Sequence, residues 1–141
     1  TDASGADVAN YTTLRWAAAA QNDFAARMQW TLTPHYRAAN HPPSVRILAG
    51  DRVRARPGTS VTLAARTRDP DRDRVTTSWW QYREEGTYPG TVAVTGGSGG
   101  RATVTVPADA EPGQTISIIL QGTDEGRFPL TRYDRVMIRV A

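Results

Sequence analysis

Two different periods of apolar residues divide the chain. Before residue 40, apolar residues recur at three- and four-residue spacing, which is the period of an amphipathic helix. We predict a helix over residues 12–30, with Pro34 as its stop. Its apolar face carries Leu14, Ala17, Gln21, Phe24 and Met28. A lone helix of this length is marginal in water, so this face, with Trp16 and Trp30 near its ends, is expected to pack on another part of the protein.

Beyond the consecutive prolines Pro42 and Pro43, which fix an extended backbone, the apolar residues alternate with polar ones. Turn signals such as Arg56-Pro-Gly58 and Glu111-Pro-Gly113 interrupt this alternation about every ten residues. About seven short strands at such spacing predict a mainly β fold, an antiparallel β-sandwich of the immunoglobulin-like or fibronectin type III-like kind. The expected strands cover residues 44–48, 60–67, 74–82, 91–95, 101–106, 114–123 and 132–140.

The prolines also mark the expected domain boundary. Residues 1–43 are predicted to form a helical lead-in and linker, and residues 44–141 the sandwich. In an immunoglobulin-like topology, the loops at 69–73, 96–100 and 123–126 would gather at one end of the sandwich.

Composition excludes several classes of function. The 141 residues contain no cysteine, so neither a disulfide framework nor a thiolate site can exist. The net charge is only +3, and the arginines are interspersed with acidic residues, so we expect no nucleic-acid partner. No apolar run approaches the roughly 18 residues that span a bilayer, so no membrane partner is expected either.

Adjacent tryptophans suggest a binding surface. Trp79 and Trp80 must point to opposite faces of a strand, and the alternation sends Trp79 into the core. Trp80 then lies beside Tyr82 on the outer face, where flat rings can stack on a sugar. Tyr88 in the next connection would extend this platform, and the alternative is that Tyr88 packs beside Pro89 in a tight loop. The alternative is that Trp80 and Tyr82 pack beneath the helix, against Trp16, Phe24 or Trp30.

Four carboxylates form a second candidate site. Asp69, Asp71, Asp73 and Asp124 would offer hard oxygen ligands for Ca²⁺ at one end of the sandwich. The alternative is that they cap backbone amides in an Asx turn and pair with the surrounding arginines. No other cofactor is expected. The chain is also not expected to be an enzyme, because the neighbouring Glu84 and Glu85 cannot face each other across a cleft as glycosidase carboxyls do.

Several strings resemble a known family, namely Asn22-Asp-Phe-Ala-Ala-Arg-Met-Gln-Trp30, Ala39-Asn-His-Pro-Pro43, Trp79-Trp-Gln-Tyr82, Gly86-Thr-Tyr-Pro-Gly90 and Pro129-Leu-Thr-Arg-Tyr133. Over residues 11–140 the chain is similar to the C-terminal region of bacterial cellulose-binding proteins that carry a nucleoside-hydrolase-like domain in front. The calcium-chelating aspartate motif of such hydrolases does not begin this chain. The Asp-Pro-Asp-x-Asp turn also resembles that of polycystic-kidney-disease-like and cadherin-like modules, but Arg72 replaces its usual glycine, so a positive φ there would be strained.

This resemblance implies a non-catalytic accessory domain of a secreted or periplasmic hydrolase-like protein, with cellulose or a related glycan as its partner. Two alternatives remain. The domain could be purely structural and stabilise the upstream hydrolase-like domain, or it could contribute a lobe to that domain's active site.

Overall fold

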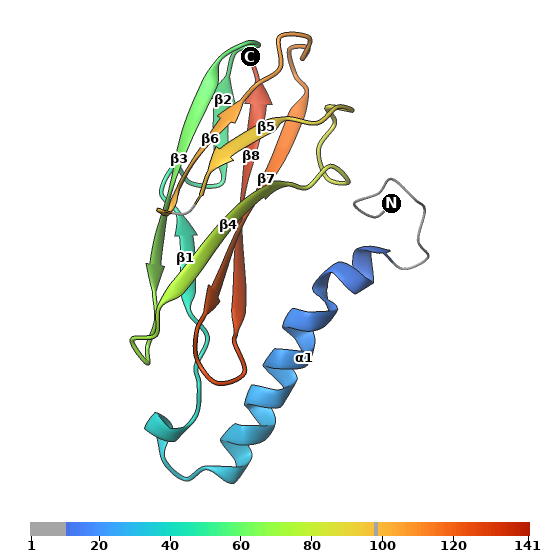
Figure 1. Ribbon diagram of the computed structural model, residues 1–141. Helices are drawn as coiled ribbons and strands as arrows, with labels where there is room; N and C mark the ends of the chain where they lie inside the picture. Colours follow the sequence, from blue (N-terminus) through green and yellow to red (C-terminus); the bar gives the residue numbers. More distant parts are fainter. Residues whose placement is uncertain (1–10, 98) are drawn as a thin grey trace.

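The computed structural model describes residues 11–97 and 99–141, with the side chains of residues 11–15, Leu14 among them, outside the description. In this part of the chain, one α-helix and a short 3₁₀ helix precede eight strands (Figure 1). The elements are α1 Tyr11–Leu32, η1 Tyr36–Ala38, β1 Ser44–Ile47, β2 Arg52–Ala55, β3 Ser60–Arg68, β4 Val75–Gln81, β5 Ala93–Gly96, β6 Arg101–Thr105, β7 Thr115–Asp124 and β8 Thr131–Val140.

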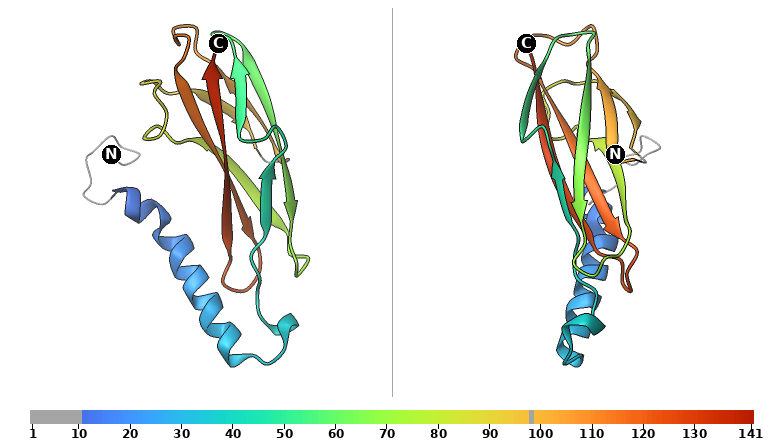
Figure 2. Two further views of the ribbon diagram at one scale, coloured as in Figure 1. Left: turned by 180° about the vertical axis from the view of Figure 1, so that it is seen from behind. Right: turned by 90° about the vertical axis from the view of Figure 1, so that its left-hand side faces the viewer.

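The strands form two four-stranded sheets with the orders β1-β3-β6-β5 and β2-β8-β7-β4. Every pair is antiparallel except β2 with β8, which is parallel. The two sheets lie face to face and enclose the core (Figure 2). The predicted mainly β sandwich of immunoglobulin-like kind is therefore confirmed.

Strand β2 was missing from the predicted set. The chain leaves the first sheet after Ile47, turns through Gly50 at φ 84°, and enters the second sheet beside β8. The positive φ at this turn is a conformation that glycine adopts without steric cost. Because β2 has only four residues, two of them arginines, its alternation is too brief to stand out from a loop.

The core consists of the inward-facing residues of both sheets. Its fully buried members are aliphatic: Leu63, Val104, Val106, Ile116, Ile118, Leu120, Val136, Ile138 and Val140. Burying a side chain of this size contributes roughly 1.5 to 3 kcal/mol relative to exposure. The ring of Trp79 joins this cluster with 8% of its surface exposed, which confirms its predicted inward direction.

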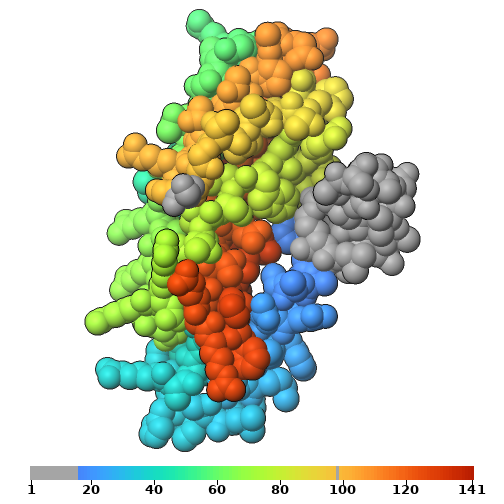
Figure 3. Space-filling model, in the orientation of Figure 1, coloured from blue at the N-terminus to red at the C-terminus, as the bar shows by residue number. Residues whose placement is uncertain are grey.

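Helix α1 lies beside the end of the sandwich that is remote from the C-terminus (Figures 1 and 2). Trp16 and Asp23 contact the sandwich, and Trp30 contacts the linker at Asn40. These three residues recur every seven positions and so share one side of the helix. In Figure 3 the blue surface of α1 meets the red surface of β8.

The predicted docking face of the helix was wrong in part, because Phe24 is 67% exposed and Met28 51% exposed. The spacing of apolar residues cannot reveal that a charged residue of the helix anchors it to the sandwich. Asp23 accepts hydrogen bonds from Arg132 at 3.2 Å, and these turn the Asp23 side of the helix inward. The Arg27 and Arg132 guanidinium groups hold the pKa of Asp23 below its usual value despite partial burial.

A search for membrane-spanning helices among the described residues finds no candidate, because α1 lacks the necessary hydropathy.

Candidate functional site

A cluster of aromatic rings joins the helix to the outer face of the second sheet. Trp80 of β4 lies 5.5 Å from Trp16 of α1 and 6.0 Å from Tyr82, measured between ring centroids. Trp16 also contacts the rings of Tyr82 at 6.3 Å and Tyr133 at 4.7 Å, edge to face in both cases. Trp80 and Tyr82 therefore do lie on the outer face, but Trp16 of the helix packs against both of them.

Phe24 and Trp30, the other two helix residues expected to cover Trp80 and Tyr82, have different surroundings. Phe24 projects into solvent, and Trp30 stacks on the His41 ring at a centroid distance of 5.7 Å. Sequence reasoning did not select Tyr133, which lies near the start of β8, after the turn that joins β7 to β8. Its only signal was its place in the Pro129-Leu-Thr-Arg-Tyr133 string.

Beside the aromatic cluster lies an open groove of about 500 Å³. It is lined by Trp16, Asp51, Tyr82, Glu85, Ile119, Tyr133, Asp134 and Arg135. Tyr133 is 37% exposed, and burial of the rest of its side chain raises the pKa of its phenol. The groove therefore combines ring surface with hydrogen-bonding groups.

Glu85 occupies a fixed position in this groove. One of its oxygens accepts a hydrogen bond from Ser117 Oγ at 2.8 Å, and the other pairs with the Arg135 guanidinium. Ser117 is fully buried on β7, an inner strand of its sheet, so the carboxylate is anchored to a buried position.

The groove adjoins a second hollow, of about 530 Å³, that shares Asp51 and Arg135 with it. Four arginines line this hollow, namely Arg52, Arg54, Arg135 and Arg139. Only one acidic residue, Asp51, is among its lining residues. The hollow is therefore positively charged and complementary to anionic groups.

Tyr88 does not extend the aromatic surface. Its ring is only 7% exposed and belongs to the core cluster, and its hydroxyl donates to Asp109 Oδ1 at 3.0 Å. The backbone N–H groups of Thr87 and Tyr88 both donate to the Thr115 carbonyl, which holds the connection against β7 and directs the ring inward. Burial, followed by the hydrogen bond and charge of Asp109, raises the pKa of the Tyr88 hydroxyl.

The acidic end of the sandwich is built by the loop between β3 and β4. Asp69 Oδ1 accepts hydrogen bonds from the backbone N–H groups of Asp71 at 2.8 Å and Asp73 at 3.1 Å, so the expected Asx-type turn is present. Carboxylate oxygens of these three residues lie within 4.8 Å of one another.

Asp124 approaches this loop from the end of β7. It pairs with Val75 in the antiparallel ladder, and Glu125 N continues the ladder by donating to Arg74 O at 3.0 Å. The loops at 69–73 and 123–126 are thus neighbours, as expected. The loop at 96–100 forms its hydrogen bonds farther along the strands. Gly97 O accepts a hydrogen bond from Thr77 Oγ1, and Gly100 O accepts one from Ala65 N.

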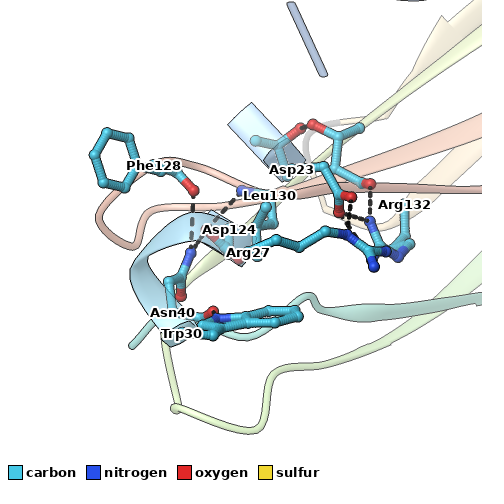
Figure 4. A network of polar contacts seen from close by, with 10 residues as sticks. Asp23, Arg27, Trp30, Asn40, Asp124, Phe128, Leu130 and Arg132 are labelled. Atoms are coloured by element: carbon cyan, nitrogen blue, oxygen red, sulfur yellow. Dashed lines mark hydrogen bonds and ion pairs between the residues drawn. The ribbon is translucent and has the colours of Figure 1, made fainter. Parts of the chain in front are cut away.

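Sequence reasoning missed a linker residue that completes this end. Asn40, 7% exposed, donates through Nδ2 to Asp124 Oδ1 at 2.9 Å and to Phe128 O at 3.3 Å (Figure 4). The next residue, His41, binds Asp71 through its backbone N–H at 2.6 Å and its ring Nδ1 at 3.0 Å. Their signals were their position directly before the double proline and their place in the Ala39-Asn-His-Pro-Pro43 string.

The expected pairing of the aspartates with arginines is absent from the described residues. Asp69, Asp71 and Asp73 have no arginine partner there, and Arg74 instead lies 3.9 Å from Glu125. Burial, together with the negative charges of Asp69, Asp124, Asp71 and Glu125, raises the pKa of Asp73. Negative charge is therefore concentrated here, and no arginine of the described residues pairs with Asp69, Asp71 or Asp73.

Arg72 has a φ of 67°, so the strain predicted for this turn position is confirmed. We expect Arg72→Gly to raise the free energy of unfolding by about 0.5 to 1 kcal/mol, since relief of the left-handed strain exceeds the entropy that glycine adds to the unfolded chain. Thermal denaturation in EDTA would measure this. A lower melting temperature would contradict the strain argument.

The fold is an immunoglobulin-like sandwich with an N-terminal helix packed on its outer face, an architecture that occurs in proteins of many functions and does not by itself define one. Residues 60–140 match the family model described as the C-terminal domain of the cellulose-binding protein Sde0182, and the chain belongs to this family. Among curated proteins, none matches the chain.

Among solved structures, the chain is similar to a nucleoside hydrolase-related hypothetical protein from Saccharophagus degradans that is associated with carbohydrate metabolism. The TM-score is 0.85 and the sequence identity 37%, over 90% of this chain and 32% of that one. The chain thus spans about a third of the length of that protein. The resemblance expected from the sequence motifs is confirmed.

Proposed function

We propose that the chain is a non-catalytic, carbohydrate-binding accessory domain of a secreted or periplasmic, nucleoside hydrolase-related protein, with cellulose or a related glycan as its ligand. The observation that carries this proposal is the open groove, in which three aromatic rings adjoin a carboxylate held in place by Ser117 and Arg135. The name of its family and the carbohydrate association of its structural relative support the same class of ligand.

The groove offers the two kinds of contact that a sugar ring needs. Tyr82 and Tyr133 present ring surface, on which the apolar face of a pyranose can stack. Glu85 and Asp134 present carboxylate oxygens that accept hydrogen bonds from hydroxyl groups. Trp16 closes one side of the groove and sets the spacing between the two tyrosines.

The test is retention of the chain on insoluble cellulose, with soluble polysaccharides examined by affinity electrophoresis. We expect Tyr82→Ala and Tyr133→Ala each to weaken binding about tenfold, equivalent to about 1.4 kcal/mol. Phe24→Ala is the matched control, because Phe24 is an exposed aromatic residue outside the groove. Equal retention of all three variants would show that binding, if any, occurs elsewhere.

The polysaccharide panel includes acidic polymers, because the arginine-lined hollow continues the groove. Arginine binds carboxylates and sulfates with paired hydrogen bonds. A neutral glycan would leave this hollow unfilled, whereas a uronate-containing chain would occupy both. Comparison of the two classes at matched salt concentration therefore defines the ligand more closely.

A second candidate function is structural. Phe24, Met28 and Leu32 recur every four residues and are all exposed. Met28 and Leu32, with Phe128, border a hollow of about 450 Å³. An apolar stripe of this kind is suited to cover by another domain, and the hydrolase-like part upstream is the candidate occupant. In this role the domain would stabilise that part or contribute a lobe to its active site. Failure of the chain to bind every polysaccharide in the panel would favour this candidate.

A further inference from the structure

The arginine-lined hollow continues the aromatic groove along one face of the second sheet. Because side chains alternate along a strand, Tyr133, Arg135, Met137 and Arg139 of β8 all point to this outer face. Tyr133 lines the groove, Arg139 lines the hollow, and Arg135 lines both. Six residues of extended strand separate Tyr133 from Arg139, a length of roughly 20 Å. The combined surface therefore suits a polymer better than a single small ion.

The strand register places four guanidinium groups around Met137 in the hollow. Arg52 of β2 is the ladder partner of Met137, and Arg54 is the ladder partner of Arg139. Arg135 and Arg139 lie two residues before and after Met137 on the same face of β8. The hollow therefore has an apolar centre and a cationic border.

Three of these arginines lack an acidic partner among the described residues. Arg135 pairs with Glu85, whereas no ion pair of the described chain includes Arg52, Arg54 or Arg139, all of which are exposed. Arg54 and Arg139 are also ladder partners, and like charges at such positions repel each other. An anion bound between these two side chains would remove the repulsion, so the arrangement favours anion binding.

Protection of a sheet edge explains only part of this arrangement. β2 is an edge strand, and charged side chains on an edge strand discourage its pairing with other chains. This accounts for Arg52 and Arg54. Arg135 and Arg139, however, lie on β8, an inner strand of the sheet, where there is no edge to protect. A role in binding accounts for the four arginines together.

We propose, on the basis of the carbohydrate-binding function proposed above, that the hollow binds carboxylate groups of a uronate-bearing glycan whose neutral units lie in the aromatic groove. Arginine suits this role because its guanidinium group donates paired hydrogen bonds to a carboxylate. In the groove, the carboxylates of Glu85 and Asp134 would repel a polymer that carries negative charge on every unit, as a nucleic acid does. The ligand therefore carries acidic groups on some of its sugar units and not on all.

A matched pair of polymers tests the need for a carboxylate. Glucuronoxylan and its carboxyl-reduced form share a backbone and differ in charge, and isothermal titration calorimetry measures the Kd of each. At about 50 mM NaCl we expect the acidic form to bind at least about tenfold more tightly, and at about 500 mM NaCl this advantage should fall by at least about half, because salt screens exposed charges.

The other outcomes of this comparison are distinct. Equal affinity for the two forms would overturn the carboxylate site and leave the proposed carbohydrate-binding function standing. Binding of neither form would overturn both. Equally tight binding of dextran sulfate would indicate non-specific attraction to polyanions and would overturn the carboxylate site as well.

Arg54→Gln and Arg139→Gln test the hollow itself. Each substitution removes one charge of a repelling ladder pair on the surface, so the variants should keep the fold. We expect each to weaken binding of glucuronoxylan about fivefold and to leave the affinity for the carboxyl-reduced form unchanged. Arg46→Gln is the matched control, because Arg46 is exposed and is the ladder partner of another arginine, Arg66, on the other sheet. An equal loss of affinity in Arg46→Gln would indicate an effect of net charge and would refute the assigned site.

Tyr133→Ala separates the groove from the hollow. This variant should weaken binding of both forms of the polymer, because both use the ring surface of the groove, whereas Arg139→Gln should affect the acidic form alone. If Tyr133→Ala left both affinities unchanged while Arg139→Gln lowered that for glucuronoxylan, the carboxylate site would stand and the proposed role of the groove would fail. If Arg139→Gln left the affinity for glucuronoxylan unchanged, the carboxylate site would be refuted.

Discussion

Asp124→Ala is expected to lower the free energy of unfolding by about 3 kcal/mol in EDTA. The substitution removes the acceptor shared by Asn40 Nδ2, Gly126 N and Leu130 N, the last of which belongs to a fully buried residue. Each buried donor left unpaired costs about 1 to 3 kcal/mol, and loss of the buried charge offsets part of the sum. Urea denaturation followed by tryptophan fluorescence would measure the difference.

Asp124→Asn is the matched comparison for this prediction. Asparagine has nearly the same shape and keeps one acceptor oxygen for the loop between β7 and β8, so the substitution should cost only about 1 kcal/mol. Asp124→Ala should also speed exchange of the Gly126 and Leu130 amides, because both lose their acceptor. If the free energy of unfolding of Asp124→Ala were within about 0.5 kcal/mol of that of the parent, Asp124 would not organise this end of the sandwich.

The sandwich was predictable because its strands carry a simple period. Ile116, Ile118 and Leu120 alternate along β7, and all three are fully buried. Alternation of this kind determines which face of a strand turns inward, independently of neighbouring elements. The direction of Trp79 could be read from the same rule. By contrast, β2 pairs with β8 only through tertiary structure, and no local pattern predicts a parallel partner 85 residues away in sequence, such as Met137 for Arg52.

The candidate sites were less predictable because they depend on contacts between distant residues. For Tyr88 the sequence left open whether the ring faces solvent or packs beside Pro89, and two backbone hydrogen bonds to Thr115 turn it into the core. The role of Asn40 could not be read from the local sequence, because its partner, Asp124, is 84 positions away. Trp16 was recognised as a helix residue that needs cover, yet its place between Tyr82 and Tyr133 required the docking angle of α1.

Trp80→Ala is expected to lower the free energy of unfolding by about 2 to 3 kcal/mol, less than for a fully buried tryptophan because the ring is only half-buried. The Trp80 ring packs against the Trp16 ring at a centroid distance of 5.5 Å. Loss of the Trp80 ring should therefore also release the N-terminal half of α1 from the sheet. Urea denaturation measures the first effect, and hydrogen exchange of residues 17–30 measures the second, with an expected acceleration of at least about tenfold.

Hydrogen exchange in α1 distinguishes two roles of Trp80 that glycan retention alone cannot distinguish. If Trp80 contacts the sugar directly, Trp80→Ala weakens binding while exchange in α1 stays unchanged. If Trp80 instead supports the groove through Trp16, binding and helix protection fall together, and Trp80→Phe restores most of both because a smaller ring still contacts Trp16. Phe24→Ala, on the exposed side of the same helix, should alter neither quantity. The ring contacts of Trp16 with Trp80, Tyr82 and Tyr133 favour the supporting role, since a sugar would reach Tyr82 and Tyr133 before it reached Trp80.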